Sequence, residues 1–232
     1  MDLTTTDSAS LTLTWANELL GGGNPAAFLV APGRFVSASR NGDSLALTLG
    51  GDQPFGLGLG PNPPVDPRWT SCAIDNSSFG DHLGQLGARD EWDFYSINVA
   101  LTDDERTVEV IRDDDVVTRL LHEHAPQSQV WPGNTEIVHW YGVRSVQGTW
   151  ASIAALVRWE SGLHVLSSVA TVSDLRGRGF APTLVKGVIT EARHHGATWL
   201  GLGVGHWNLP AQRVYQRVGF SLRANFTNYS TG

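Results

Sequence analysis

The sequence predicts a mixed α/β (α+β) fold, in which a mostly antiparallel sheet is flanked by helices. Three apolar, β-branched runs follow one another over residues 137–146, 150–159 and 163–172, with short turns between them. Runs of this length joined by short turns are typical of antiparallel strands. The apolar spacing then changes, because residues 180–192 repeat their apolar side chains every three or four positions, as a helix does. A chain of 232 residues, 41% of them hydrophobic, can bury a core around such a sheet.

The first part of the chain has a different composition. Residues 20–64 are rich in Gly and Pro between short apolar runs, which predicts short strands and turns. The sequence Gly-Leu-Gly-Leu-Gly at residues 56–60 invites comparison with a phosphate-binding loop. No Lys follows it, however, and Pro61 opposes the helix that such a loop needs. We therefore favour ordinary strand and turn structure for this stretch.

A charged segment separates two expected domains. Residues 92–101 alternate as a strand does, and the acidic and basic residues 103–106 then predict a solvated turn. We place the boundary there, with an N-terminal mixed α/β domain over residues 1–106 and a second domain over residues 107–232.

The second domain alternates between strand and helix patterns. Asp113, Asp114 and Asp115 precede an apolar helical pattern, where acidic residues cap a helix and complement its dipole. We prefer this interpretation to a metal site, because no second ligand cluster lies nearby in sequence. The other expected elements are a strand at residues 108–111, the three central strands, a helix at 180–192 closed by Gly196, a strand at 199–204, a helix from Asn208 to 218 and a final strand region at 220–229.

A glycine-containing loop joins the third central strand to the following helix. Residues 176–181 read Arg-Gly-Arg-Gly-Phe-Ala, which fits the pattern R-x-x-G-x-A. A loop that leads into a helix directs backbone N–H groups outward at the positive end of the helix dipole, where phosphate binds. Glycine lets the backbone approach an anion closely, while Arg176 and Arg178 add positive charge. The loop is a candidate pyrophosphate site, although Gly and Arg also occur in ordinary exposed turns.

A second motif follows about thirty residues later. The step Leu202-Gly203-Val204 ends a strand, and residues 208–220 carry the pattern N-x-x-A-x-x-x-Y-x-x-x-G-F, in which Asn208 and Tyr215 are the polar positions. In order and spacing, the strand, the loop, the helix and this motif resemble the GNAT superfamily of N-acetyltransferases. The resemblance covers residues 165–220 and implies the GNAT fold.

The resemblance also implies a site for acetyl-coenzyme A (acetyl-CoA) and no metal. The main chain of residues 169–171 would pair with the pantetheine arm, and the loop would hold the pyrophosphate. Asn208 would contact the cofactor, and Tyr215 would act near the sulfur as general acid. Periodicity alone favours Tyr215 as a core aromatic, and the family spacing reverses that preference. The implied cofactor-binding residues are Val169, Ala170, Thr171, Arg176, Gly177, Arg178, Gly179, Phe180, Ala181, Pro182 and Asn208.

One position departs from the family pattern. Many members have a carboxylate in the middle of the Leu-x-Val step, where it helps to deprotonate the amine, and this chain has Gly203. An amine of pKa ~10.4 must lose a proton before it attacks, so another group or water must accept that proton. The candidates are Glu160, His164, His139 and His206. We prefer His206, because it directly follows the strand whose carboxyl end would face the acceptor.

The leading hypothesis is an acetyl-CoA dependent N-acetyltransferase that transfers the acetyl group directly to a primary amine. Two rivals remain open: a catalytically weak module that binds or senses acyl-CoA, and an enzyme that acetylates a protein N-terminus or an aminoacyl-RNA. Residues 1–106 would then be a degenerate copy of the same fold, by analogy with tandem members of the family.

Composition narrows the partners and the compartment. A net charge of −7 argues against a nucleic-acid surface, since phosphate binding depends on clustered Lys and Arg. The expected acceptor is a small-molecule or peptide amine. Cys72 is the only cysteine, so no intrachain disulfide forms, and no apolar run reaches the roughly 20 residues of a membrane span. We expect a cytoplasmic protein, and a homodimer that pairs an exposed strand edge near the C-terminus stays open.

Overall fold

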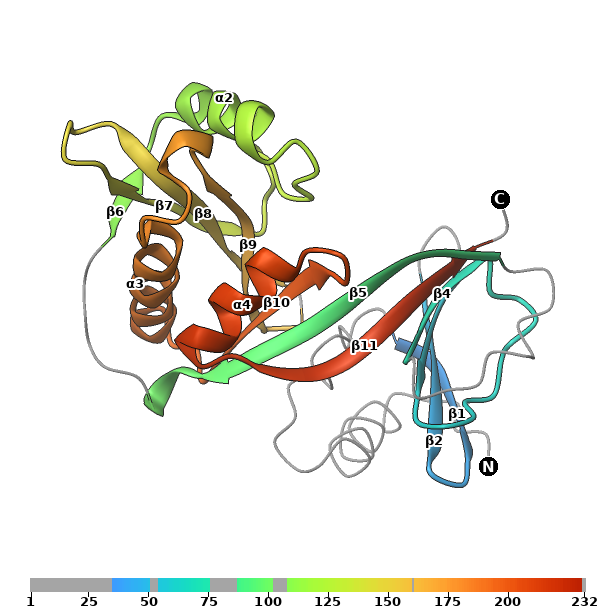
Figure 1. Cartoon of the computed structure of the whole chain (residues 1–232). Helices are drawn as coiled ribbons and strands as arrows, with labels where there is room; N and C mark the ends of the chain where they lie inside the picture. The colour runs from blue at the N-terminus through green and yellow to red at the C-terminus, as the bar shows by residue number, and fades with distance from the viewer. Residues whose placement is uncertain (1–34, 51–53, 76–86, 102–107, 160, 231–232) are drawn as a thin grey trace. The chain divides into compact units, whose positions relative to one another are not determined.

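The computed structural model describes residues 35–50, 54–75, 87–101, 108–159 and 161–230 (Figure 1). The chain divides into two compact units. Unit 1 comprises residues 1–95, 203–209 and 222–232, and unit 2 comprises residues 96–202 and 210–221. The boundary predicted between residues 106 and 107 lies outside the described residues and stays a prediction.

Unit 2 contains the predicted antiparallel strands in the predicted order. Its strands follow the spatial order β10-β9-β8-β7-β6, in which β6 to β9 are antiparallel and β9 with β10 is parallel. Figure 1 shows this unit with α3 beside the strands, and α3 packs against β7, β8 and β9. The elements are β6 (Glu109–Ile111), α2 (Asp114–His124), β7 (Ile137–Arg144), β8 (Trp150–Arg158), β9 (His164–Thr171), α3 (Phe180–His194), β10 (Trp199–Gly205) and α4 (Leu209–Val218).

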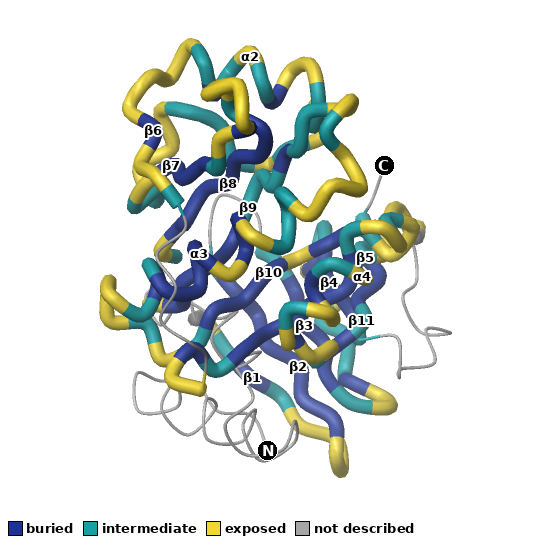
Figure 2. Tube along the Cα trace, turned by 60° about the vertical axis from the view of Figure 1, so that its left-hand side comes forward, coloured by how far each residue is buried: buried dark blue, intermediate teal, exposed yellow. Residues whose placement is uncertain are grey.

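Helix α3 begins and ends as its sequence predicts. Its apolar residues at helical spacing are buried, and β8 beneath it is buried along most of its length (Figure 2). At its end, the N–H of Gly196 donates to Arg193 O at 2.9 Å and that of Ala197 donates to Ala192 O at 3.0 Å. Gly196 has φ 82°, so this end is a Schellman motif closed by glycine.

Helix α2 confirms the capping interpretation of the three aspartates. The Asp113 carboxylate accepts a hydrogen bond from the N–H of Val116 at 3.0 Å, and Asp114 and Asp115 lie in the first turn. In the described part of the chain, no group of three or more His, Cys, Asp or Glu side chains is arranged to hold a metal ion.

Unit 1 is built on strands from the two ends of the chain. Its strands follow the order β1-β2-β3-β4-β11-β5, and β11 pairs antiparallel with β4, so that Phe226 lies opposite Asp75. These strands are β1 (Phe35–Asn41), β2 (Ser44–Leu49), β3 (Phe55–Leu59), β4 (Ser71–Asp75), β5 (Gly87–Asn98) and β11 (Ser221–Ser230). Strands β5, β10 and β11 each have residues in both units.

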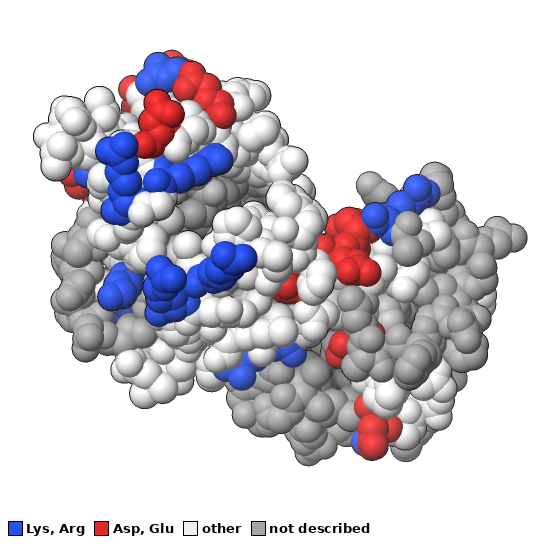
Figure 3. All heavy atoms as spheres, viewed as in Figure 1, with Lys and Arg blue, Asp and Glu red and all other residues white. Residues whose placement is uncertain are grey.

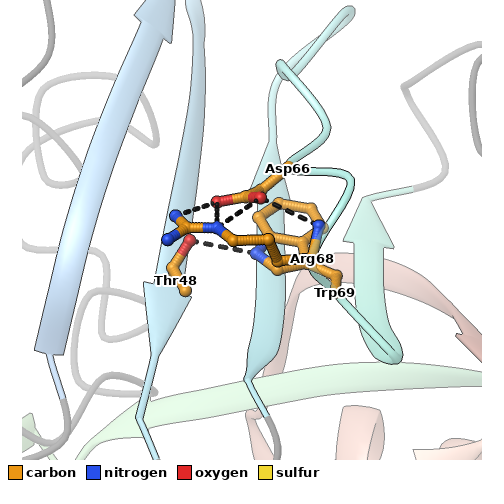
Figure 4. Close-up of polar contacts among 4 residues, drawn as sticks. All are labelled: Thr48, Asp66, Arg68 and Trp69. Atoms are coloured by element: carbon orange, nitrogen blue, oxygen red, sulfur yellow. Dashed lines mark hydrogen bonds and ion pairs between the residues drawn. The ribbon is translucent and has the colours of Figure 1, made fainter.

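The glycines of the Gly-Leu-Gly-Leu-Gly stretch make room for neighbouring side chains. Gly56 and Gly58 lie in β3, where a Cβ on Gly56 would be 2.2 Å from the Trp69 ring and one on Gly58 would be 2.6 Å from Ile74, whereas Gly60 follows the strand with φ 85°. The buried Trp69 donates its indole N–H to Thr48 Oγ1 at 2.9 Å, and Arg68 beside it pairs with Asp66 (Figure 4). The glycines therefore serve packing, which agrees with our rejection of a phosphate-binding loop.

The fold class is the predicted one: a large, mostly antiparallel sheet with flanking helices. None of the helices in the described ranges is long and apolar enough to cross a membrane. The idea that residues 1–106 are a degenerate copy of the second domain stays a prediction.

Candidate functional site

Strand β9 carries an irregularity just before the residues expected to bind pantetheine. Ser168 has φ 51°, which is unusual for a residue other than glycine, and the β8–β9 register shifts between Ile153 and Ala155. The Ser168 hydroxyl stabilises this conformation, because it donates to Val130 O at 2.7 Å and accepts from Val130 N at 3.3 Å. The strand therefore changes direction at Ser168, as strands do at a β-bulge.

The bulge separates a paired part of β9 from a part with an available edge. The parallel pairing with β10 joins His164 to Leu200 and Val165 to Gly201, and within the described residues it extends no further. Beyond the bulge, Ala170 and Thr171 pair with β8 on their other side. Main-chain groups beyond the ladder accept hydrogen bonds from, or donate them to, an added strand. The family resemblance predicts that the pantetheine arm pairs with the main chain at this edge, along residues 169–171.

The loop after β9 has the geometry of an anion cradle. Gly177 has φ 76° and Gly179 has φ 89°, and no atom lies within 4 Å of where a Cβ would stand on either residue. Both glycines are exposed, and α3 starts immediately after them at Phe180. The first N–H groups of a helix have no partner within the helix, so the start of α3 offers donors to a ligand. Pro182 lies in the first turn, where its missing N–H costs little.

Arg176 holds this loop in place. Its guanidinium donates to Thr171 O at 3.2 Å, at the end of β9, and to His124 O at 2.9 Å, at the end of α2. The loop is thereby anchored to two elements, and a cation at the carboxyl end of α2 also complements the helix dipole. Arg178 is exposed and makes no hydrogen bond within the described residues.

Positive charge gathers on the part of unit 2 formed by the loop and the two following helices. Figure 3 shows Lys and Arg side chains over α3 and α4. The exposed cations here are Arg178 in the loop, Lys186 in α3, and Arg213 and Arg217 in α4. This patch fits the phosphate groups of a nucleotide-like cofactor, although the whole chain carries a net charge of −7. The sequence does not show this patch, because residues 178 and 213 are far apart along the chain.

Tyr215 is a core residue of α4, and its role as general acid stays a prediction. Its side chain is 7% exposed, and its ring meets that of Phe220 edge-on at 6.0 Å, as a core residue would. Within the described residues, its hydroxyl has no hydrogen-bond partner, and burial raises the pKa of Tyr215. A protonated, unpaired phenol can donate a hydrogen bond to a ligand atom that reaches it.

His206 is paired with a carboxylate that sequence reasoning missed. It directly follows β10, and its Nδ1 lies 3.0 Å from Oδ1 of Asp93 in β5. Asn225 of β11 also donates its side-chain N–H to Asp93. Asp93 is the second residue of a Trp-Asp-Phe-Tyr run that follows Asp90 and Glu91, so no local signal in the sequence marked it out. The backbone N–H of Asn208 donates to Gly205 O at 2.8 Å in the turn that follows.

The other candidate bases have different surroundings. His164 is buried, and its pKa is lowered by burial and by the nearby Arg158 and His195. His139 is exposed, with its ring 5.5 Å from that of His195. Glu160 lies outside the described residues.

Two further residues clarify what the site lacks. Gly203, where many relatives have a carboxylate, is exposed, and a Cβ there would meet only the Trp92 ring, at 3.4 Å. Space for a side chain therefore exists at this position. Cys72 is buried, and burial raises the pKa of its thiol to about 11, so it is a poor nucleophile at neutral pH.

The bulged strand, the glycine turn and the helix after it are the parts of the fold to which the sequence resemblance assigns an acyl-CoA site. The chain belongs to the acetyltransferase (GNAT) family, since the model of that family matches residues 89–220, more than half of its length. Members typically use acetyl-CoA as co-substrate, and membership supports acyl transfer as the general activity. Among curated proteins, none matches the chain significantly.

Solved structures of low sequence identity share the fold over nearly the whole chain. A GCN5-related N-acetyltransferase from Sphaerobacter thermophilus is 15% identical with a TM-score of 0.59, covering 99% of this chain and 94% of that one. A GCN5-related N-acetyltransferase from Kribbella flavida is 15% identical with a TM-score of 0.58, covering 96% and 95%. An acetyltransferase of the GNAT family from Colwellia psychrerythraea is 10% identical with a TM-score of 0.54, covering 99% and 98%. At these identities the similarity concerns the fold alone.

Proposed function

We propose that this protein is an acetyl-CoA dependent N-acetyltransferase that acetylates a primary amine directly, without a covalent enzyme intermediate. The observation that carries the proposal is the open backbone cradle at Gly177 and Gly179, between the bulged β9 and the start of α3. The buried Cys72 gives no support to a covalent route. We assign catalysis to residues 107–232, in a cytoplasmic enzyme whose acceptor is a small-molecule or peptide amine.

The residues fit the cofactor in three parts. The edge of residues 169–171 that lies beyond the pairing with β10 would take the pantetheine amides, and the N–H groups from Gly177 to Ala181 would take the pyrophosphate. Arg178 adds charge, while Arg176 keeps the loop in position. When bound, acetyl-CoA supplies the thioester whose carbon forms the new bond to nitrogen as its bond to sulfur breaks.

Tyr215 is the proposed general acid. A thiol has a pKa of ~8.5 and a phenol one of ~10, and burial raises the pKa of Tyr215 further. The hydroxyl therefore keeps its proton over the working range and would donate a hydrogen bond to the departing sulfur. Full proton transfer from it would be uphill, so its main contribution is stabilisation of the negative charge.

His206 is the proposed base. An amine of pKa ~10.4 arrives protonated, and the neutral imidazole accepts one proton from it before the attack. A second proton leaves the nitrogen as the amide forms and neutralises the departing thiolate. The proton held by His206 then passes to solvent, so the reaction releases one proton in all.

A binding and turnover experiment tests the proposal. Acetyl-CoA affinity is measured by calorimetry, and CoA release is then followed with a panel of amines: polyamines, amino sugars, aminoglycosides and peptides with free N-termini or lysines. We expect submicromolar to micromolar binding and transfer to at least one class. Binding without transfer to any amine would favour the acyl-CoA sensing module instead, and absence of binding would refute both.

Tyr215→Phe tests the general acid. We expect turnover to fall by about 10²-fold, in line with loss of one hydrogen-bond donor to the developing negative charge, while the affinity for CoA stays unchanged. Tyr141→Phe is the matched control, because Tyr141 is also a buried tyrosine of unit 2 and its hydroxyl contacts Glu191 and His195. Unchanged turnover in Tyr215→Phe would remove Tyr215 from the mechanism.

A further inference from the structure

We propose that Asp93 is a positioning residue, which fixes the ring of His206 so that Nε2 is the nitrogen that accepts the proton of the amine. The inference rests on the proposed function for the role of His206, and on the geometry of unit 1 for the role of Asp93. It also explains how a family member with Gly203 in place of the usual carboxylate can still deprotonate its acceptor.

Strand β5 holds His206 at two points. The backbone N–H of His206 donates to Glu91 O at 3.0 Å, and its ring Nδ1 lies 3.0 Å from Oδ1 and 3.2 Å from Oδ2 of Asp93. Glu91 and Asp93 are two residues apart on the same strand. Main chain and ring are therefore fixed by one rigid element, which restricts the rotation of the imidazole.

The burial of Asp93 makes this contact difficult to attribute to an ordinary surface ion pair. The Asp93 side chain is 2% exposed, whereas 54% of the His206 side chain is exposed. A buried carboxylate is costly unless hydrogen bonds satisfy its oxygens, and here His206 and the Asn225 amide both contribute. Asn225 lies on β11, so two strands orient the carboxylate that orients the ring.

The contact decides which nitrogen carries the proton. A carboxylate accepts hydrogen bonds and cannot donate one, so the neutral ring places its proton on Nδ1 and its lone pair on Nε2. This is the tautomer that a general base needs when its second nitrogen faces the reaction. Without the carboxylate, the two tautomers would compete, and the ring would turn more freely.

The same contact makes the base stronger. The hydrogen bond and the charge of Asp93, with a smaller contribution from Glu91, raise the pKa of His206. Asn225 of β11, which also donates to Asp93, is uncharged and adds no charge of its own next to the ring. A raised pKa means that more His206 is protonated at neutral pH, so kcat/KM should rise with pH through a value above the ordinary 6.5.

The tautomer can be read in the wild-type protein. Nitrogen-15 NMR of histidine-labelled protein above pH 8 should give a protonated-type signal for Nδ1 of His206 and an unprotonated-type signal for Nε2, with His206→Gln for assignment. A predominant Nε2–H tautomer would overturn the proposal. This measurement needs no acceptor and no variant of Asp93.

Asp93→Asn tests the link to catalysis, and Asp90→Asn is its matched control. Asp90 lies on the same strand, is exposed and accepts from Asn228, so its substitution removes the same charge from β5 without touching the ring. In Asp93→Asn we expect the NMR titration of His206 to move to lower pH. The rising limb of kcat/KM should move with it, and the high-pH plateau should fall about tenfold or more. Asp90→Asn should change neither markedly.

The outcomes separate the two proposals. If His206 titrates at the same pH in Asp93→Asn as in the wild type, the positioning role is wrong, whatever the activity. If the titration moves but the pH profile of transfer does not, Asp93 orients a ring that is not the base, and the inference fails while acetyl transfer stands. If the wild type transfers acetyl to no amine, the proposed function fails on its own test.

Discussion

Gly179 is the residue whose backbone conformation matters most for the proposed cradle. Its φ of 89° is strained for any residue with a Cβ, and the empty space beside it is where the pyrophosphate would lie. We expect Gly179→Ala to weaken binding of CoA at least tenfold, because the methyl group occupies that space. The strain should also lower the stability by about 1 kcal/mol. Calorimetry and thermal unfolding measure the two effects.

Gly148→Ala separates strain from blockage. Gly148 lies in the turn between β7 and β8, with φ 80° and no atom within 4 Å of where a Cβ would stand, so it repeats the local conditions of Gly179 away from the loop. It should lose similar stability and keep its affinity for CoA. Equal losses of affinity in both variants would contradict the cradle.

At the scale of single residues, sequence reasoning succeeds where a pattern is local. The helical periodicity around Tyr215 predicts a core position, and its side chain is buried. Asp93 shows the limit. Its partner His206 is 113 residues away, and nothing local distinguishes this carboxylate from a solvated one. Only the fold shows which residues meet.

At the scale of elements, the loop before α3 contains two arginines with different tasks. Arg176 bridges β9 and α2, so Arg176→Ala should lower the stability by about 1 kcal/mol, which corresponds to roughly 2–4 °C in Tm. Arg178→Ala removes an exposed cation without hydrogen bonds in the described part of the chain, so Tm should hardly change. Thermal unfolding distinguishes the two.

Binding completes the comparison of the arginines. Arg178→Ala should weaken CoA binding more at low salt than at high salt. Dissolved salt screens the attraction between an exposed arginine and a phosphate, so less of that attraction remains to be lost at high salt. Arg176→Ala should weaken it at every salt concentration, because the loop is no longer anchored. If Arg178→Ala lowers Tm as much as Arg176→Ala does, the assignment of loop anchoring to Arg176 and of charge alone to Arg178 is wrong.

Elements also differ in how far the sequence predicts them. Helix α3 and strands β7 to β9 follow from apolar spacing and from Gly196, since each is specified by neighbouring residues. The bulge in β9 does not, because Ser168 has an ordinary sequence context and its positive φ is stabilised by Val130, 38 residues earlier. The edge of residues 169–171 follows that bulge, where β9 is no longer paired with β10.

At the scale of the whole molecule, pairing between distant segments is the unpredicted part. Residues 71–75 and 226–230 form neighbouring strands of unit 1, although about 150 residues separate them. The apolar pattern of each segment predicts a strand. It does not predict that the two strands pair with each other, or in which register. The family match begins at residue 89, so it does not cover β1 to β4 either.

Two histidines should make the stability of the whole molecule depend on pH in opposite directions. The pKa of His164 is lowered by burial, so its contribution to stability is fully present above the unfolded value near 6.5 and is lost as pH falls through the folded value. The pKa of His206 is raised by Asp93, so its contribution is present below about 6.5 and is lost as pH rises through the folded value. Because His206 is half exposed, solvent screening makes its effect the smaller one.

Urea unfolding between pH 5 and pH 9 measures both histidines with two variants. His164→Phe removes the buried imidazole, so its free energy of unfolding should fall less than that of the wild type below pH 6.5. Asp93→Asn removes the partner of His206, so its free energy of unfolding should fall less above pH 6.5. In the pH range governed by the other histidine, each variant should show the same pH dependence of the free energy of unfolding as the wild type. The reason is that the two histidines act through separate contacts. If a variant instead weakens the pH dependence of unfolding on the other side of pH 6.5, the direction assigned to the effect of its histidine is wrong.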